Sequence, residues 1–316
     1  MTTEAGAPSS PPAPEAAPGF SPAPDAATDR SPAPSAATGL SPAPDAATGL
    51  SPAGEAVREL LGRAPGLRLM ALGARVNAGS LDLEPFGVRA EFLDAAENGA
   101  WVSCYLEANR RAFGGPLELP GWVLVDCYLW PGAIGLLVGP GGPGRGPPAP
   151  GLPGERLIAA YVALPSVEPG VFMGCSLFSF SEGGGFGRLI KALTLKMLRA
   201  RAQRGIAQWG NGSLRVHTRM GPLALEGPVP AVHGRARDSF AYRVELGDEV
   251  GWGRALRGQP EGEGAGPAPA WVPVGERARL EGLLERARGG ERVEICAPGL
   301  DGAGQNVRIR AWGGAP

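Results

Sequence analysis

The chain has 316 residues, of which 51 are glycine and 34 are proline. The combined content of glycine and proline is higher than in ordinary globular domains and predicts Gly/Pro-rich tails or linkers. A hydrophobic content of 43% nevertheless requires a folded part. The formal net charge is −1, so no overall positive field draws the chain to nucleic acid or to a membrane, and we expect neither as a partner.

The four cysteines, Cys104, Cys127, Cys175 and Cys296, lie far apart and form no CxxC pair. This spacing excludes a zinc knuckle and a dense disulfide framework, so we expect no metal cofactor and reduced thiols in a cytoplasmic protein. The first ten residues carry neither a basic residue nor an apolar core, and we expect no secretory signal there. Nearly all basic residues are arginine, which is typical of a GC-rich, bacterial genome.

Residues 11–60 fall into ten-residue blocks built on Ser-Pro-Ala-Pro. Such blocks keep the backbone extended and offer almost nothing to bury, so they predict a disordered tail over 1–50. A docking array for a proline-binding protein partner is the alternative interpretation. Ser51 is a good helix N-cap and Pro52 suits the first helical position, so the folded part is predicted to begin near Ser51.

In chain order, the pattern predicts helices over 53–62, 101–113, 188–204 and 276–288. Strands are predicted over 67–76, 88–92, 122–129, 133–138, 156–164, 171–180, 205–209, 223–229, 239–246, 292–296 and 307–312. The apolar run 121–139 is read as two strands rather than a membrane span, because Pro131 interrupts it. We therefore expect an α+β domain over 51–250, a Gly/Pro linker over 251–270 and a small αββ appendage over 271–316.

The strongest local signal is the glycine-rich turn that joins the strand 171–180 to the basic helix after it. Glycines at the start of a helix leave backbone N–H groups bare, and the positive end of the helix dipole favours phosphate oxygens. Arg188 and Lys191 follow in this helix. The sequence therefore predicts a site for a ligand with several phosphates.

Neither the Walker spacing nor the Rossmann spacing fits these glycines. Instead, Gly185-Phe186-Gly187 at a strand-to-helix junction resembles the acetyl-CoA motif of the GNAT acetyltransferase superfamily. The order of predicted elements over about 90–246 is similar to that family too, and the stretch from Asn211 to Gly221 resembles its asparagine-containing segment. The resemblance implies a mixed, mostly antiparallel central sheet with flanking helices.

The resemblance also implies an activity, the transfer of an acyl group from acetyl-CoA or another acyl-CoA to an amine. The family's cofactor-binding residues correspond here to residues of the strand 171–180, of the glycine turn with the helix after it, and of the stretch that begins at Asn211. They are Leu177, Phe178, Gly183, Gly185, Gly187, Arg188, Lys191 and Asn211. His217 stands nearest to the place of the family's tyrosine, so it is the candidate catalytic acid for the departing thiolate. The acceptor, a small-molecule or protein amine, is not predicted.

Two observations favour an alternative, a non-catalytic binding or interaction module that retains a GNAT-like fold. The family's tyrosine is missing, and Glu182 places an anion beside the predicted diphosphate site. Glu107 and Glu118 are candidate bases for an acceptor amine, although acidic residues at exposed positions are common. Asp126 lies inside an apolar strand, where a buried carboxylate has a raised pKa or a partner, and both outcomes are frequent at functional sites. Cys175 could reach a thioester but is interpreted as a small buried hydrophobic residue.

Overall fold

The structure is a computed structural model. It describes residues 51–62, 66–73, 90–93 (backbone), 98–114, 118, 121, 132–140, 146–181, 184–229, 239–259 and 266–313. All of these belong to one unit, which spans Thr48–Pro316. The predicted tail 1–50, the predicted strand 122–129, and the residues Asp126, Glu182 and Gly183 lie outside the described residues.

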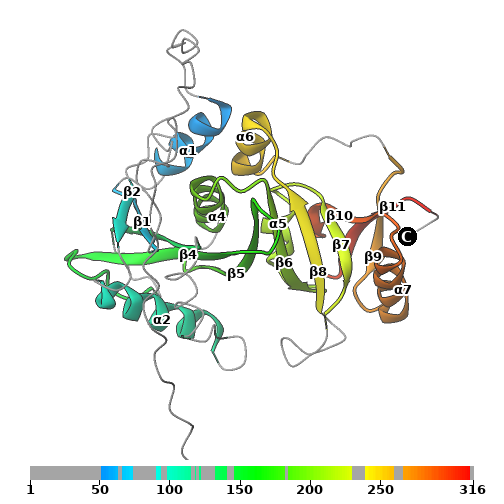
Figure 1. Cartoon of the computed structure of the whole chain (residues 1–316), viewed down its shortest axis with the longest axis horizontal. Coiled ribbons are helices and arrows are strands. Elements are labelled where there is room, and N and C mark those ends of the chain that lie inside the picture. Colours follow the sequence, from blue (N-terminus) through cyan, green and yellow to red (C-terminus); the bar gives the residue numbers. More distant parts are fainter. Residues whose placement is uncertain are drawn as a thin grey trace, which may run out of the picture. The chain divides into compact units, whose positions relative to one another are not determined.

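The described strands form one mixed sheet that is mostly antiparallel (Figure 1). Only β1 with β2 and β5 with β6 pair in parallel. From one edge to the other the order is β2 (Ala90–Leu93), β1 (Arg68–Leu72), β3 (Ala133–Pro140), β4 (Glu155–Pro165), β5 (Val171–Ser179), β6 (Ala202–Gln208), β8 (Ser239–Glu245), β7 (Leu223–Pro228), β10 (Val293–Leu300), β11 (Asn306–Ala311) and β9 (Ala270–Pro273).

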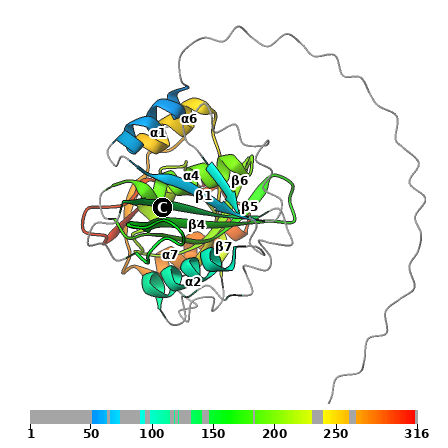
Figure 2. The same ribbon diagram turned by 90° about the vertical axis from the view of Figure 1, so that its left-hand side faces the viewer.

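Helices flank this sheet. They are α1 (Pro52–Gly62), α2 (Gly99–Phe113), α4 (Phe186–Met197), the short α5 (Leu214–His217), α6 (Glu249–Arg257) and α7 (Arg277–Arg288). Helix α4 packs on β3, β4 and β5, with α1 and α6 beside it, whereas α2 packs on β4 and β5 from the opposite face (Figures 1 and 2). Helix α7 packs on β7 and β10.

Strand β4 shows why the sheet takes helices on both faces. Ala159, Tyr161 and Ala163 belong to the core beneath α4, and Ala160 and Val162 belong to the core beneath α2. Because successive side chains of a strand point to opposite faces, a nearly continuous apolar run is buried on both sides. The run Arg156–Leu164 therefore becomes a central strand.

Helix α1 begins as its sequence predicts, because the Ser51 hydroxyl accepts a hydrogen bond from the Gly54 N–H at 3.1 Å. The helix lies against α6, and a β-carbon placed on Gly253 would lie 2.8 Å from the backbone of Pro52. Glycine at this crossing allows the two helix backbones to approach closely.

The predicted fold class is confirmed: the structure is an α+β fold with a mixed, mostly antiparallel sheet and flanking helices. The helix predicted over 188–204 is wrong at its end. Helix α4 stops at Met197, and Ala202–Gln208 is strand β6, because its backbone pairs with β5 on one side and β8 on the other. Local helix propensity is overruled here by tertiary pairing.

The predicted linker 251–270 is wrong over its first residues, which belong to α6. Asp248 caps this helix by accepting a hydrogen bond from the Gly251 N–H at 2.9 Å, and Gly258 ends it with φ of 74°. The segment 271–316 extends the main sheet, because Glu294 and Ile295 of β10 pair with Ala224 and Leu223 of β7. No helix in the described part of the chain is both long and apolar enough to span a membrane.

Candidate functional site

Strands β5 and β6 pair over only four positions, from Val171 with Ala202 to Gly174 with Gly205. Beyond this point they have no described pairing, although both strands continue to Ser179 and Gln208. Two parallel strands that start together and then separate leave a slot in the middle of the sheet. The residue after Gly174 sits in a β-bulge, since Ala163 pairs with Gly174 while Val162 pairs with Ser176 and leaves Cys175 without an opposite residue on β4.

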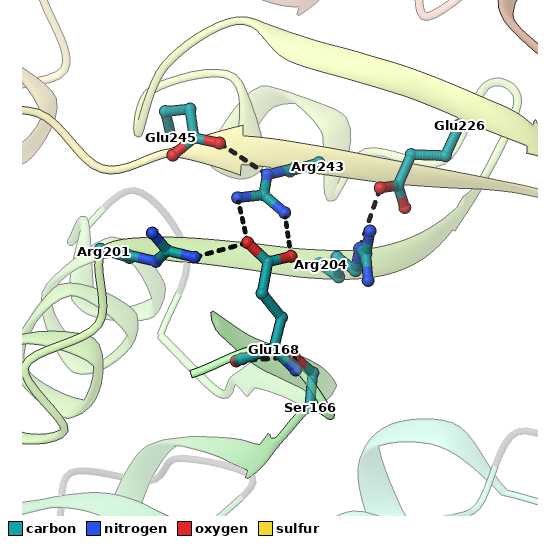
Figure 3. A network of polar contacts seen from close by, with 7 residues as sticks. All are labelled: Ser166, Glu168, Arg201, Arg204, Glu226, Arg243 and Glu245. Atoms are coloured by element: carbon teal, nitrogen blue, oxygen red, sulfur yellow. Dashed lines mark hydrogen bonds and ion pairs between the residues drawn. The ribbon is translucent and has the colours of Figure 1, made fainter. Parts of the chain in front are cut away.

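The paired end of the two strands is held by a group of ion pairs (Figure 3). Glu168, in the turn between β4 and β5, receives two hydrogen bonds from the Arg243 guanidinium of β8, at 2.6 and 3.2 Å. Arg201, just before β6, donates to the same carboxylate at 2.5 Å. The hydrogen bonds from Arg243, and the positive charges around them, lower the pKa of Glu168. We call Glu168, Arg201 and Arg243 the clamp.

A cavity of about 180 Å³ occupies the slot where β5 and β6 separate. Its walls come from both strands, from α2 and from the segment that leads into α5. The lining residues are Phe113, Tyr161, Gly174, Cys175, Ser176, Leu177, Gln203, Ile206, Ala207, Gln208, Asn211, Ser213, His217 and Tyr242.

Two glycines make room for polar side chains at the closed end of this cavity. A β-carbon on Gly174 would lie 2.5 Å from Gln203 Nε2 and 2.6 Å from the Tyr161 hydroxyl oxygen. A β-carbon on Gly205 would overlap the Tyr242 hydroxyl. Because Gly174 and Gly205 pair with each other, the space lies where the strands begin to separate. Glycine is required at both positions, since a larger side chain would displace these polar groups.

The polar side chains at this end are almost fully buried. Gln203 Nε2 donates to the Tyr242 hydroxyl at 3.3 Å, while the Tyr161 hydroxyl and Gln203 Oε1 have no hydrogen-bond partner among the described residues. Burial raises the pKa of both tyrosines, so both phenols stay protonated at neutral pH. Native structures seldom leave buried polar groups without partners, so the Tyr161 hydroxyl and Gln203 Oε1 are candidate partners for a polar group bound at this end.

His217 and Lys191 form a buried pair beside this group. Lys191 Nζ lies 2.8 Å from His217 Nδ1, and the His217 ring packs 5.3 Å from the Tyr242 ring, measured between centroids. Burial lowers the pKa of Lys191 to about 7. Burial and the neighbouring Lys191 also lower the pKa of His217 well below its ordinary value, so the imidazole is neutral. A protonated Lys191 donates to Nδ1 and leaves the N–H of His217 on Nε2.

The glycine turn forms the N-terminus of α4. Gly185 has φ of 71° and precedes the helix, and the first intrahelical bond runs from the Leu189 N–H to the Gly185 carbonyl at 3.0 Å. Among the described residues outside α4, a β-carbon on Gly187 would meet only Ser179 Cβ and Leu177 Cδ1 within 4 Å, at 3.9 and 4.0 Å. Leu177 also lines the cavity. The helix N-terminus and the cavity are therefore neighbours along β5.

The structure brings Leu177, Asn211 and His217 together, since all three line the cavity. It places Phe178 elsewhere, because this side chain points to the α2 face and stacks on Tyr105 with ring centroids 6.0 Å apart. Asn211 uses its Oδ1 to accept a hydrogen bond from the Ser213 N–H at 2.8 Å.

The predicted role of Lys191 in binding phosphate is wrong. Its side chain is fully buried against His217, on the side of α4 that faces the sheet, so it cannot reach a ligand at the helix N-terminus. Arg188 is half-buried beside α6, where its Nη1 fills the position that a β-carbon on Gly258 would take. Arg188 Nη2 lies 2.9 Å from the corresponding position on Gly185, so this guanidinium borders the glycine turn.

Sequence reasoning did not find Tyr161, Gln203 and Tyr242. They lie on three different strands, β4, β6 and β8, and only the sheet pairing brings them together. The available signal was glycine inside strand patterns, at Gly174 and Gly205, which marks a close approach by other groups. Glu107 lies outside the cavity lining and pairs with Arg110 and Arg111 on α2. Glu118 does not line the cavity either.

A second cavity, of about 710 Å³, lies between α6 and the ends of β7, β8 and β10. Its charged lining residues are nearly balanced in sign: Arg219, Arg243, Arg254, Arg292, Glu245, Asp248 and Glu294. Within the described ranges, no three His, Cys, Asp or Glu side chains gather in a way that could hold a metal ion.

Comparison with known proteins gives similarity in structure only. No protein-family model and no curated protein matches the chain. One similar solved structure is a protein assigned to the GNAT family of acetyltransferases from Desulfovibrio desulfuricans, with 10% identity and a TM-score of 0.34, covering 48% of this chain and 94% of that one. Another is yncA from Salmonella typhimurium, assigned as an acetyltransferase and solved with its cofactor acetyl-CoA. It has 15% identity and a TM-score of 0.34, and the match covers 50% of this chain and 93% of that one.

Proposed function

We propose that the chain is an N-acyltransferase that takes its acyl group from an acyl-CoA. The observation that carries this proposal is the adjacency of two features: a glycine-rich helix N-terminus suited to a diphosphate, and a cavity between separated strands suited to the reacting end of the same ligand. Leu177 adjoins both. A long ligand with phosphates at one end and a small polar group at the other fits this arrangement.

In the proposed complex, the diphosphate accepts hydrogen bonds from the first N–H groups of α4, around Gly187. These groups have no intrahelical partner in any α-helix, and Gly187 presents no side chain to obstruct the ligand. The connecting arm follows β5 beyond Gly174, where the strand has no described pairing with β6. The thioester then lies in the cavity.

The chemistry proposed there is direct transfer. The neutral acceptor amine attacks the thioester carbonyl carbon, the C–N bond forms, the C–S bond breaks, and the amine releases its proton to solvent. The thiolate that leaves must gain a proton, and His217 is the candidate donor because it lines the cavity and carries its N–H on Nε2 when Lys191 donates to Nδ1. Lys191 passes its proton to Nδ1 as Nε2 releases its own, so the imidazole stays neutral, and the lysine then regains a proton from solvent. Its lowered pKa of about 7 makes the ammonium a better acid than an exposed lysine.

Binding is tested by thermal unfolding with CoA and with acetyl-CoA, the ligand named for the Salmonella protein. A ligand that binds only the folded chain raises Tm in proportion to ln(1 + [L]/Kd). We expect both compounds to raise Tm, and Gly187→Asp to abolish the rise by placing a carboxylate against the phosphates. Gly187→Ala is the matched control, because the space around Gly187 accepts a methyl group.

Gly187→Asp should fold normally, since an acidic residue in the first turn of a helix is favourable. No Tm rise at millimolar CoA would contradict the proposal and favour a non-catalytic module. Where CoA binds, release of free thiol from acetyl-CoA over a panel of small and protein amines separates an enzyme from a binder and identifies the class of acceptor.

A further inference from the structure

The closed end of the cavity holds an unmatched pair of hydrogen-bonding groups. Tyr161 and Gln203 are each 1% exposed, yet the Tyr161 hydroxyl and Gln203 Oε1 have no partner among the described residues. The two side chains lie next to Gly174, since a β-carbon there would lie 2.6 Å from the Tyr161 oxygen and 2.5 Å from the amide nitrogen of Gln203, Nε2. One group can donate a proton and the other can only accept one.

The orientation of the bound acyl-CoA decides which part of it contacts Tyr161 and Gln203. This orientation rests on the proposed function. With the diphosphate at Gly187 and the arm along β5, the ligand runs from Leu177 toward Gly174. The slot closes there, because Gly174 pairs with Gly205 and the strands are joined from this point to Val171. The end of the ligand that meets Tyr161 and Gln203 is therefore the acyl chain.

We infer that the cavity selects a short acyl chain that carries a hydroxyl group, which accepts a hydrogen bond from Tyr161 and donates one to Gln203 Oε1. A hydroxyl is the smallest group that satisfies both buried partners at once. A plain alkyl chain leaves both groups desolvated and unpaired, which binding sites of this kind reject strongly.

The charge of the lining residues and the closed end of the slot restrict the class of acyl chain further. The described residues that line the cavity include no lysine or arginine, and the imidazole of His217 is neutral. Lys191 lies behind that ring, on Nδ1, so no lining cation pairs with a carboxylate. A carboxyacyl chain is therefore disfavoured. The slot closes where Gly174 pairs with Gly205, which limits the length of the acyl chain.

The experiment compares the Kd values of CoA, butyryl-CoA, 3-hydroxybutyryl-CoA and succinyl-CoA for the full chain, measured by titration calorimetry. We expect 3-hydroxybutyryl-CoA to bind about tenfold or more tightly than butyryl-CoA, and succinyl-CoA to bind no better than butyryl-CoA. In Tyr161→Phe, which keeps the ring and removes the hydroxyl, this preference should fall to within about twofold.

Tyr105→Phe is the matched control, because Tyr105 is an equally buried tyrosine on the α2 face, against Phe178, and should retain the full preference. Gln203→Met is the second variant and should also lose the preference, so that a folding defect in Tyr161→Phe leaves the inference testable. Equal affinities for butyryl-CoA and 3-hydroxybutyryl-CoA, with CoA itself bound, would overturn this inference alone. Absence of binding by every compound would overturn the proposed function together with it.

Discussion

Four residues that line the cavity and Lys191 behind them form a row of buried polar groups across five elements. Lys191 of α4 contacts His217 of α5, whose ring packs on Tyr242 of β8. Tyr242 accepts from Gln203 of β6, and Gln203 lies beside Tyr161 of β4. Each of these groups is costly to bury, and Lys191 most of all, because a buried ammonium loses its hydration. A row of this kind at a cavity is typical of a functional site.

The burial of Lys191 makes a prediction about stability and pH. Its pKa falls from 10.5 to about 7 on folding, so between these values the unfolded chain binds more protons than the folded one, and stability rises with pH. Below pH 7 the cost of burying the charge is present in full. We expect Lys191→Met to be more stable than the wild type near pH 6, by a few kcal/mol at most, with a difference that shrinks toward pH 10.

Denaturant unfolding at several pH values measures this difference. Lys196→Met, at the other lysine of α4, reports how much of the trend comes from losing any lysine charge on this helix. A difference between wild type and Lys191→Met that stays constant from pH 6 to pH 10 would contradict a buried, deprotonating Lys191.

At the scale of elements, the pairing of β5 with β6 decides the geometry of the site. The strands are joined at one end by four residue pairs and by the clamp, and they separate at the other. Glu168 joins the β4–β5 turn to the start of β6 and to β8 (Figure 3). The clamp therefore stabilises the closed end of the slot, against which the cavity is built.

Removing the carboxylate of Glu168 should destabilise the closed end of the slot, where β5 pairs with β6. We expect Glu168→Gln to lower Tm at pH 7, with a smaller effect at high salt, because partly exposed ion pairs are screened. The lowered pKa of Glu168 means that its contribution is present above the unfolded pKa and is lost as pH falls through the folded pKa, so the two proteins should converge at acid pH.

Glu107→Gln is the matched control for this change. Glu107 also pairs with two arginines, Arg110 and Arg111, but all three lie on α2, so the pairs connect no separate elements. Its Tm change should be clearly smaller. Equal effects of the two substitutions would show that Glu168 acts as an ordinary surface ion pair.

At the scale of the whole molecule, the described strands form one sheet from β2 to β9. The apolar residues of α7, β10 and β11 belong to the same hydrophobic cluster as α1, α4 and α6, including Leu280, Ile295 and Val307. The C-terminal segment thus shares its core with the rest. The unit that contains all described residues starts at Thr48, next to the end of the predicted tail.

We propose that residues 1–50 are a tether that the fold does not require. Deleting them leaves Ser51 to cap α1, and we expect Tm to remain within about 1 °C of the full chain. Deleting residues 1–62 also removes α1, whose Ala53, Ala56, Val57 and Leu60 are buried, and should lower Tm by several degrees. Differential scanning calorimetry of both truncations measures this contrast. A large loss on deleting 1–50 alone would refute the tether.

Much of the fold could be predicted because its signals are local. Ser51 and Pro52 mark the start of α1, and Gly185 marks the start of α4, since capping depends on a few neighbouring residues. The alternation and length of apolar runs likewise indicated β4, β5 and β8. The start of α4 was predictable because its capping signal is local. Its end was not, because the residues from Ala202 onward form β6 by pairing with β5 and β8.

What the amino-acid pattern determined by itself is thus the set of segments and the glycine turn, each of which depends on residues adjacent in the chain. Only the tertiary structure decided that Lys191 is buried against His217, and that Tyr161, Gln203 and Tyr242 meet at a pair of glycines. The physical reason is that these contacts join strands and helices far apart in the chain. The free energy of each contact depends on burial and on a partner residue from another strand or helix. A local sequence pattern predicts neither of these.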